Sequence, residues 1–317
     1  MQLGKSNRHY DWIDRWSKSP DSASARTGWA HHDIVVSENG DVIAFHQADP
    51  TVLTFNSEGD HKASWDAPVS NAHGMAIVKE DDEEFLWLAD NTTGKVVKTT
   101  LDGQTVSKLK HPDLDVYQHN KYAPTDVTVN EESNGGNGDI WVTDGYGQNY
   151  IHRYDKYGNH IGSINGEEGD AGPFTCPHGI WIDTRKDVAE LYIADRSNAR
   201  VQVYDLNGNF NRAFGTGPGA NWLHSPSGFA THGDLMMVAE LRGSRITVLD
   251  KNDELLGYLG ENPGAFAMLD DWPNVTSEDV HSGRFNSPHG IATDSSGNIY
   301  VAEWMIGGRI TKLEISN

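Results

Sequence analysis

The sequence has very little of three things: cysteine, basic charge and long apolar stretches. Cys176 is the one cysteine among 317 residues, so an intrachain disulfide is excluded and a reducing compartment is favoured. No apolar run approaches the about 18 residues of a transmembrane helix, and the first residues lack the apolar segment of a signal peptide. We therefore expect a cytoplasmic location, with export after removal of a signal peptide as the alternative.

Basic residues are far outnumbered by acidic ones. The chain has 25 Lys and Arg against 46 Asp and Glu, which gives a net charge of −21. Nucleic acids and anionic membranes attract basic surfaces, so the charge disfavours both as partners. The expected partner is a small-molecule or peptide substrate.

What the sequence does contain is a repeat. A short motif that begins with a turn and continues as an alternating strand recurs as "HHDIVV", "AHGMAI", "PTDVTV", "PHGIWI", "PSGFAT" and "PHGIAT". Its marker residues are His32, His73, Thr125, His178, Ser227 and His289. They are 41, 52, 53, 49 and 62 residues apart, which is the spacing of four-stranded propeller blades with variable loops.

Each repeat continues in the same order. A second alternating strand ends on an acid or its stand-in, as in "GDVIAFH", "EFLWLAD", "GDIWVTD", "ELYIAD", "DLMMVAE" and "GNIYVAE", and further strands follow after turn residues. The pattern predicts an all-β protein, a six-bladed β-propeller, built as a single domain over residues 1–317. The expected blades cover approximately residues 30–68, 72–110, 123–165, 177–215, 226–260 and 288–317, with residues 9–16 as an N-terminal strand that completes the last blade.

The marker residues begin the innermost strands, so we expect them around the propeller axis. His73, His178 and His289 fall on alternate blades, and three converging imidazoles can bind a metal, most simply zinc, with a position left open for water or substrate. His32 is a possible fourth ligand. The alternative for any single histidine is a structural one, in which it caps its strand by hydrogen bonding.

A second set of candidates comes directly after the acid of each repeat. Tyr146 and Arg196 are the predicted catalytic residues, because a tyrosine beside a metal and an arginine can act as a base and an arginine can hold a carboxylate. Gln47, Arg242 and Trp304 are the predicted substrate-binding residues. The acids themselves are expected to be structural. Cys176 lies close enough to His178 to approach the metal, but an inert, buried thiol is the favoured interpretation.

These motifs resemble known families. "SPHGIATDSSGNIYVAE" and "ADRSNARVQVYDLNGN" are similar to NHL repeats, and the chain from residue 40 onward resembles peptidyl-α-hydroxyglycine α-amidating lyase, the lyase domain of peptidylglycine α-amidating monooxygenase. The resemblance implies a zinc bound by His73, His178 and His289. It also implies a catalytic tyrosine at Tyr146 in "TDGYGQ" and a functional arginine at Arg196 in "ADR".

The chain also departs from that family. An arginine of the first blade is replaced by Gln47, which Arg242 is expected to compensate, and a methionine before the last marker histidine is replaced by Ser287. The family's structural calcium implies a site that uses the backbone of Ile34 and Met75. Its aspartate falls on Gly290, with Asp33 on the first blade as the substitute, and a disulfide cysteine falls on Gly147.

The leading hypothesis is a zinc-dependent lyase that cleaves a carbon–nitrogen or carbon–oxygen bond of a carbinolamide-like or related hydroxylated substrate without redox chemistry. The first alternative is a non-catalytic NHL propeller that binds a protein or peptide ligand. The second alternative is a propeller hydrolase such as a sugar lactonase. A histidine-rich set of ligands fits that class poorly, because the lactonase propellers hold calcium with carboxylate and asparagine ligands.

Overall fold

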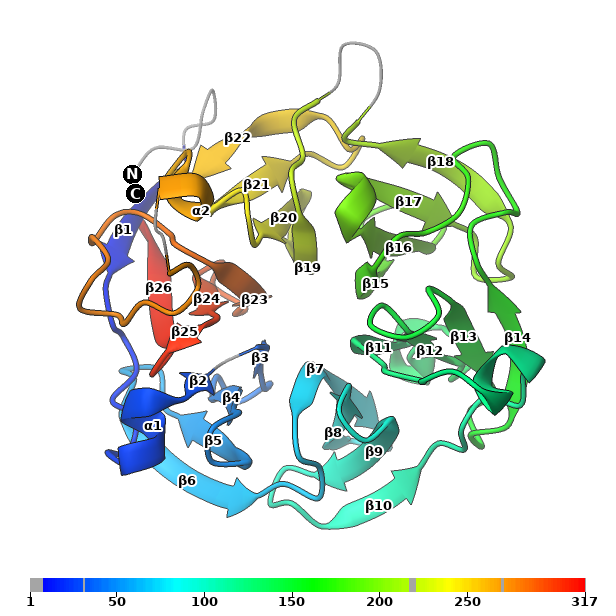
Figure 1. The fold of residues 1–317 in the computed structure, drawn as a ribbon, viewed down its shortest axis with the longest axis horizontal. Coiled ribbons are helices and arrows are strands. Elements are labelled where there is room, and N and C mark those ends of the chain that lie inside the picture. The colour runs from blue at the N-terminus through cyan, green and yellow to red at the C-terminus, as the bar shows by residue number, and fades with distance from the viewer. Residues whose placement is uncertain (1–7, 31, 217–220, 269–270, 317) are drawn as a thin grey trace. The chain divides into compact units, whose positions relative to one another are not determined.

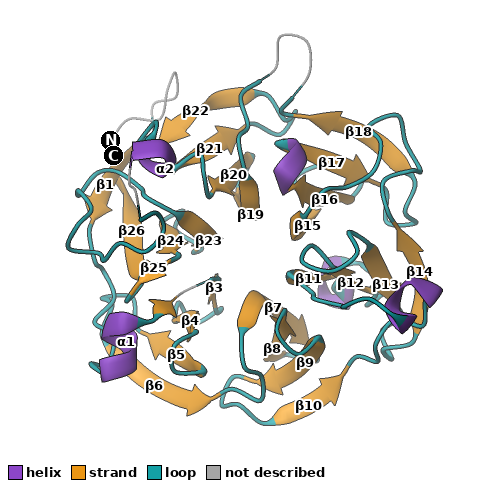
Figure 2. Cartoon of the chain, viewed as in Figure 1, coloured by secondary structure: helices purple, strands orange, loops and turns teal. Residues whose placement is uncertain are grey.

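The computed structural model describes residues 8–30, 32–216, 221–268 and 271–316. Most of its regular structure is β-strand, and the helices are short segments within connections (Figure 2). The chain divides into two compact units: residues 1–66 and 223–317 form the terminal unit, and residues 67–222 form the central unit. None of the helices in the described residues is long and apolar enough to cross a lipid bilayer.

The central unit contains three four-stranded antiparallel sheets (Figure 1). Blade 2 consists of β7 (Ala72–Glu80), β8 (Glu83–Asp90), β9 (Lys95–Thr100) and β10 (Thr105–Lys108). Blade 3 consists of β11 (Asp126–Val129), β12 (Ile140–Thr143), β13 (Ile151–Tyr154) and β14 (His160–Ile164). Blade 4 consists of β15 (Pro177–Asp183), β16 (Glu190–Asp195), β17 (Arg200–Tyr204) and β18 (Phe210–Phe214). Three 3-10 helices, η1 (Asp115–Gln118), η2 (Glu132–Asn134) and η3 (Arg196–Asn198), lie in the connections.

The terminal unit contains the other three four-stranded sheets. Blade 1 consists of β3 (Ile34–Val36), β4 (Val42–His46), β5 (Thr51–Phe55) and β6 (His61–Asp66). Blade 5 consists of β19 (Pro226–His232), β20 (Leu235–Glu240), β21 (Arg245–Leu249) and β22 (Leu255–Leu259). Blade 6 consists of β23 (Pro288–Thr293), β24 (Ile299–Glu303), β26 (Arg309–Ser316) and β1 (His9–Ile13). A small extra sheet pairs β2 (Trp29–Ala30) with β25 (Met305–Ile306), and the helices are α1 (Ala23–Thr27) and α2 (Ala265–Met268).

Six four-stranded sheets confirm the predicted fold class, an all-β six-bladed propeller.

The turns between the outer strands have a common local cause. Before β18, for example, the carboxylate of Asp205 accepts the N–H groups of Asn207 (2.8 Å) and Asn209 (2.9 Å), and Gly208 takes a left-handed conformation with φ of 91°. The interpretation of the chain as a single domain stays a prediction.

The N-terminal strand completes the last blade, as predicted. β1 pairs antiparallel with β26, from His9 opposite Ser316 to Ile13 opposite Lys312. Beyond the strand, the backbone N–H of Trp16 donates to Ile310 (2.8 Å). The outer edge of β26 is thereby covered, so its N–H and C=O groups are not left unpaired.

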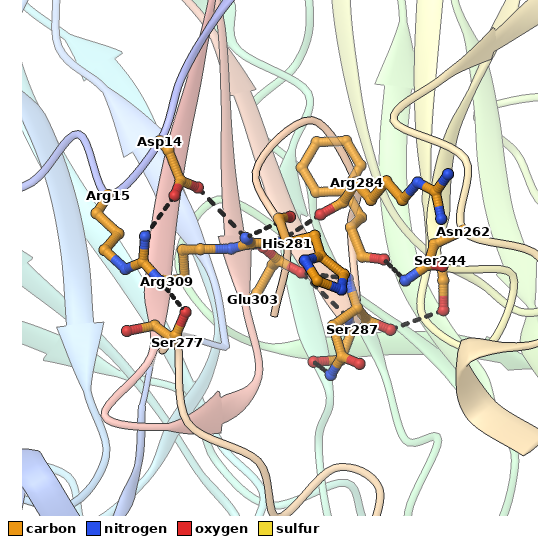
Figure 3. A network of polar contacts seen from close by, with 12 residues as sticks. Asp14, Arg15, Ser244, Asn262, Ser277, His281, Arg284, Ser287, Glu303 and Arg309 are labelled. Carbon is orange, nitrogen blue, oxygen red and sulfur yellow. Dashed lines mark hydrogen bonds and ion pairs between the residues drawn. The ribbon is translucent and has the colours of Figure 1, made fainter. Parts of the chain in front are cut away.

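A buried arginine fixes this closure from the side (Figure 3). Arg309 forms an ion pair with Glu303, and both side chains are 0 % exposed. Its guanidinium also lies 3.3 Å from the carboxylate of Asp14 and donates to the carbonyl oxygens of His281 (3.3 Å) and Arg284 (2.7 Å). One side chain therefore ties together the last blade, the segment after β1 and the long connection that precedes β23.

The hydrophobic core of each unit lies between neighbouring blades. In the central unit, Trp87 of blade 2 packs in one cluster with Ile140 of blade 3, and Trp141 packs in another with Ile193 of blade 4. Successive residues of β12 therefore face opposite sides of their sheet, as alternation in a strand requires. Both sides of blade 3 are therefore buried, which fixes the register of its strands.

Candidate functional site

In the central unit, hydrogen bonds link the marker residues of neighbouring blades. His73 Nδ1 lies 2.8 Å from the carbonyl oxygen of Thr125, and Thr125 Oγ1 donates to the carbonyl oxygen of His178 (3.0 Å). All three side chains are buried. A carbonyl can only accept, so Nδ1 of His73 carries the proton and Nε2 presents a lone pair. Fixing a tautomer in this way is how proteins orient histidines that bind metals.

The terminal unit repeats this arrangement. Ser227 Oγ donates to the carbonyl oxygen of His289 (3.1 Å), and His289 Nδ1 lies 2.6 Å from the carbonyl oxygen of His32. By the same reasoning, Nε2 of His289 presents a lone pair. The rings of His289 and His32 lie 5.0 Å apart. The structure thus gives two of the predicted zinc ligands, His73 and His289, the tautomer that a metal requires.

The acids that end the second strands are structural, as predicted. Asp90, Asp144, Asp195, Glu240 and Glu303 are all 0 % exposed. Each accepts a backbone N–H from the segment just before the marker residue of its own blade; the donors are Ser70, Ala123, Thr175, His224 and Asn286. In blade 1 the position is occupied by His46, whose Nδ1 accepts the N–H of Asp49 (3.3 Å) and whose pKa is lowered by burial. The acids therefore hold the entry to each inner strand in place.

Tyr146 lies in a turn that only glycine neighbours allow. A Cβ atom on Gly145 would meet the carbonyl oxygen of Pro177 at 2.1 Å, and one on Gly147 would meet the carboxylate of Asp144 at 2.0 Å. The tight turn brings the Tyr146 hydroxyl to 3.2 Å from His73 Nε2 and 3.4 Å from His178 Nε2. Three predicted site residues of the central unit thus meet at one oxygen atom.

Arg196 joins this group as the first residue of η3. Its Nη2 lies 3.1 Å from the Tyr146 hydroxyl and 3.1 Å from the sulfur of Cys176. Nη1 is buried and has no hydrogen-bond partner among the described residues. Burial by itself would lower the pKa of the guanidinium, but the neighbouring Tyr146 and Cys176 raise this pKa above its ordinary value. Arg196 therefore stays a cation and has hydrogen-bonding capacity to spare.

The predicted substrate-binding residues all belong to the terminal unit. The Trp304 ring lies 5.7 Å from His32 and 5.1 Å from Trp29, which the extra β2–β25 sheet holds beside it. The Arg242 guanidinium lies over the ring of Phe266, 5.0 Å from its centre. Gln47 Oε1 is buried and has no hydrogen-bond partner among the described residues. Their roles stay predictions.

The predicted calcium ligands are divided between the two units. Asp33 Oδ1 accepts the N–H of Ile34 (2.9 Å) in the terminal unit, whereas Met75 lies on β7 of the central unit. A Cβ atom on Gly290 would lie 2.5 Å from the Cα of Asp33, so a side chain at position 290 would collide with the backbone there. The chain's glycine at the family's aspartate position thus suits its own Asp33, and the calcium site stays a prediction.

Sequence reasoning missed a buried polar network behind Tyr146. Tyr117 donates to Asp144 (2.6 Å) and lies 2.7 Å from His152 Nε2, while His152 Nδ1 lies 2.8 Å from Ser163. Ser163 also lies 2.8 Å from His160 Nε2. Burial raises the pKa of Asp144 and, with a smaller contribution from His160 and His111, lowers the pKa of His152 to about 3. The only sequence signal was a histidine in the strand "YIHRY", and alternation alone does not show that it is buried.

Comparisons with known proteins agree with the family resemblance that the motifs indicate. The NHL repeat family matches residues 285–304, which include the last marker histidine. NHL repeat-containing protein 3 of Homo sapiens is 29 % identical over 254 residues, which cover 74 % of this chain and 67 % of that protein. Peptidyl-alpha-hydroxyglycine alpha-amidating lyase 1 of Drosophila melanogaster is 24 % identical over 352 aligned positions, which cover 95 % of this chain and 59 % of the fly protein.

The chain carries an NHL repeat and resembles the amidating lyases. A solved streptogramin B lyase also matches, with a TM-score of 0.63 and 17 % identity, and the match covers 97 % of this chain and 98 % of that one. At such an identity the likeness shows the fold alone, and it supports the six-bladed propeller. The NHL match and the amidating lyase relatives confirm the resemblance inferred from the motifs. The chain spans little more than half of the fly lyase.

Proposed function

We propose that this NHL-type propeller is a zinc-dependent lyase similar to peptidyl-α-hydroxyglycine α-amidating lyase. It would cleave a carbinolamide-like or related hydroxylated substrate without redox chemistry. One observation carries the proposal: the Tyr146 hydroxyl lies within 3.4 Å of His73 Nε2, His178 Nε2 and Arg196 Nη2. A phenol, two imidazoles and a guanidinium at one point are the groups that general base catalysis with charge stabilisation needs.

The residues present fit a transition metal. Nε2 of His73 presents a lone pair because Nδ1 is bonded to a carbonyl, and His289 has the same tautomer for the same reason. Zinc would be held by His73, His178 and His289, with His32 as a possible further ligand, and would supply Lewis-acid stabilisation to an oxygen of the substrate. Calcium, on Ile34, Met75 and Asp33, would have a structural role.

Tyr146 would act as the base. Its phenolic oxygen would accept the proton of the substrate's carbinol hydroxyl, and the guanidinium of Arg196 lies 3.1 Å from that oxygen. As the C–O bond becomes a carbonyl, the C–N bond breaks and the departing nitrogen takes up the proton that Tyr146 received. Arg196 Nη1 would hold the substrate's carboxylate, and Gln47, Arg242 and Trp304 would contact the rest of the substrate.

The decisive experiment measures zinc content and turnover together. Purified protein should contain zinc, and it should release glyoxylate from an α-hydroxyhippurate-like carbinolamide. Tyr146→Phe should keep the metal and the fold but lower turnover at least about a hundredfold, which is the usual contribution of a placed general base. The matched control is Tyr157→Phe, because Tyr157 is 80 % exposed in the same unit.

Two outcomes would contradict the proposal. If Tyr146→Phe kept the full turnover, Tyr146 would not be the base. A zinc-loaded protein that cleaves none of a panel of carbinolamides and hydroxy acids would favour the non-catalytic binding propeller instead.

A further inference from the structure

Cys176 has a backbone conformation that a cysteine rarely adopts. Its φ is 57°, in the left-handed region that favours glycine. Two hydrogen bonds hold it there: its N–H donates to Asn149 Oδ1 (2.8 Å), and its carbonyl oxygen accepts the N–H of Arg196 (3.2 Å). The surrounding structure therefore fixes the position of a side chain that the backbone alone would disfavour.

The thiol that is placed in this way contacts the candidate site. Arg196 Nη2 is shared between the sulfur of Cys176 and the hydroxyl of Tyr146, each 3.1 Å away. The two acceptors fix the plane of the guanidinium and leave Nη1 buried, without a hydrogen-bond partner among the described residues. Arg196 Cζ also lies over the Tyr146 ring, 5.2 Å from the ring centre, and Tyr146 is 39 % exposed.

We propose that Cys176 is the positioning residue of this site: its thiol orients Arg196 so that Nη1 bonds to an oxyanion of the ligand, a carboxylate in the simplest case. A buried guanidinium nitrogen without a partner is satisfied best by a charged acceptor, and carboxylates match the planar geometry of arginine. The inference deepens the proposed function and rests on it for the identity of the ligand. It also places the sulfur of Cys176 directly beside the bound oxyanion.

A pair of alkylating reagents tests this placement without any turnover assay. Iodoacetate and iodoacetamide both transfer a substituted methylene to the thiol sulfur, with loss of iodide and of the thiol proton, and they differ in charge. The chain's net charge of −21 repels iodoacetate in general, so a simple exposed thiol should prefer iodoacetamide. If Arg196 Nη1 binds the carboxylate, iodoacetate should label Cys176 about tenfold faster than iodoacetamide. Because Cys176 is the one cysteine, the label can be counted by mass.

Two variants separate orientation from folding. Cys176→Gly removes the sulfur at a left-handed position where glycine is unstrained, so the melting temperature should not fall. Cys176→Ser keeps an acceptor for Arg196 Nη2. We expect Cys176→Gly to weaken the binding of hippurate, measured by calorimetry, about tenfold, and Cys176→Ser to restore most of it. If the enzyme is active, Cys176→Gly should raise KM and Cys176→Ser should restore most of it, while kcat should change less.

The outcomes distinguish this proposal from the proposed function. A preference for iodoacetate that disappears in Arg196→Gln supports the positioning role even if no carbinolamide is cleaved. A preference for iodoacetamide that Arg196→Gln does not change would overturn it, even in an active lyase. Equal affinity of wild type and Cys176→Gly for hippurate would also overturn it.

Discussion

The two units link their marker residues by the same hydrogen bonds but surround them differently. In the central unit the order is His73, Thr125 and His178; in the terminal unit it is Ser227, His289 and His32. In both units a hydroxyl donates to the carbonyl of the following marker and a histidine Nδ1 bonds to the carbonyl of the marker after it. These bonds go to the backbone, so they depend on the fold and tolerate different side chains in the neighbouring positions.

The difference lies in the residues around the markers. The central unit places a phenol, a guanidinium and a thiol around its histidines, at Tyr146, Arg196 and Cys176. The terminal unit places Trp304 and Trp29 beside His32. A repeated scaffold therefore carries reactive groups in one unit and flat aromatic surface in the other. The two units therefore differ in the side chains around markers that the same backbone hydrogen bonds hold in place.

The largest expected effect concerns the ion pairs of two structural acids, Glu303 in the terminal unit and Asp195 in the central unit. In the terminal unit Arg309 and Glu303 are both 0 % exposed, whereas in the central unit Arg200, the partner of Asp195, is 17 % exposed. Arg309→Met leaves a buried carboxylate without its cation and should lower the free energy of unfolding by about 3–5 kcal/mol. Arg200→Met should cost less, because water can reach that carboxylate's surroundings. Chemical denaturation of both variants measures the difference.

The control for this comparison is Arg15→Ala. Arg15 pairs with Asp14 beside the same network, but its side chain is 44 % exposed (Figure 3), so its removal should change stability by less than about 1 kcal/mol. If Arg309→Met were as mild as Arg15→Ala, the buried pair would not be what fixes the closure of the last blade.

The sequence was sufficient for the fold because the signals were local and repeated. Alternating strands, turns with Asp and Gly, and an acid at a constant place predict blades without knowledge of contacts. The strand that completes the last blade was predictable because the sixth repeat lacks an outer strand of its own and residues 9–16 can supply it. The extra β2–β25 sheet was not predicted. It consists of two residues on each strand, too few for any periodic pattern.

The candidate residues could be chosen from the sequence, but the contacts between them could not. The position of Tyr146 after an acid indicated that it lies near the markers, and the structure brings it to His73 and His178. The contact between Cys176 and Arg196 depends on a left-handed φ at a cysteine, which no sequence rule anticipates. The network from Asp144 to His160 depends on the connection before β11, which brings Tyr117 to 2.6 Å from Asp144 and 2.7 Å from His152, and no local sequence pattern predicts that approach.

The same network makes the stability of the central unit depend on pH, through the buried side chain of His152. Folding lowers the pKa of His152 from 6.5 to about 3, so the neutral form is favoured in the folded state and stability is complete above pH 6.5. Below that value the unfolded chain binds a proton that the folded chain does not, and stability falls with pH until about pH 3. Between pH 7 and pH 4 the loss from this residue should be about 3 kcal/mol.

The measurement is the free energy of unfolding from denaturant titrations at pH 7 and pH 4. His152→Gln removes the titrating group and should reduce the difference between the two pH values, although it lowers stability at pH 7 by breaking bonds to Tyr117 and Ser163. His61→Gln, at an exposed histidine of the terminal unit, is the control and should leave the difference unchanged. An equally steep loss in His152→Gln would assign the pH dependence to other groups.

The smallest expected effect tests whether the marker residues of the central unit contribute more to binding and turnover than those of the terminal unit. Thr125 Oγ1 and Ser227 Oγ are both buried donors to the carbonyl of the next marker, so Thr125→Val and Ser227→Ala should each lower stability by about 1 kcal/mol. Thr125 Oγ1 also accepts the N–H of Gly145, next to Tyr146, at 3.3 Å. We therefore expect Thr125→Val to weaken hippurate binding and carbinolamide turnover several-fold, and Ser227→Ala to leave both nearly unchanged. If the two variants lowered binding equally, the chemistry would depend on both units to the same degree, and the contrast drawn from the residues around Tyr146 would be wrong.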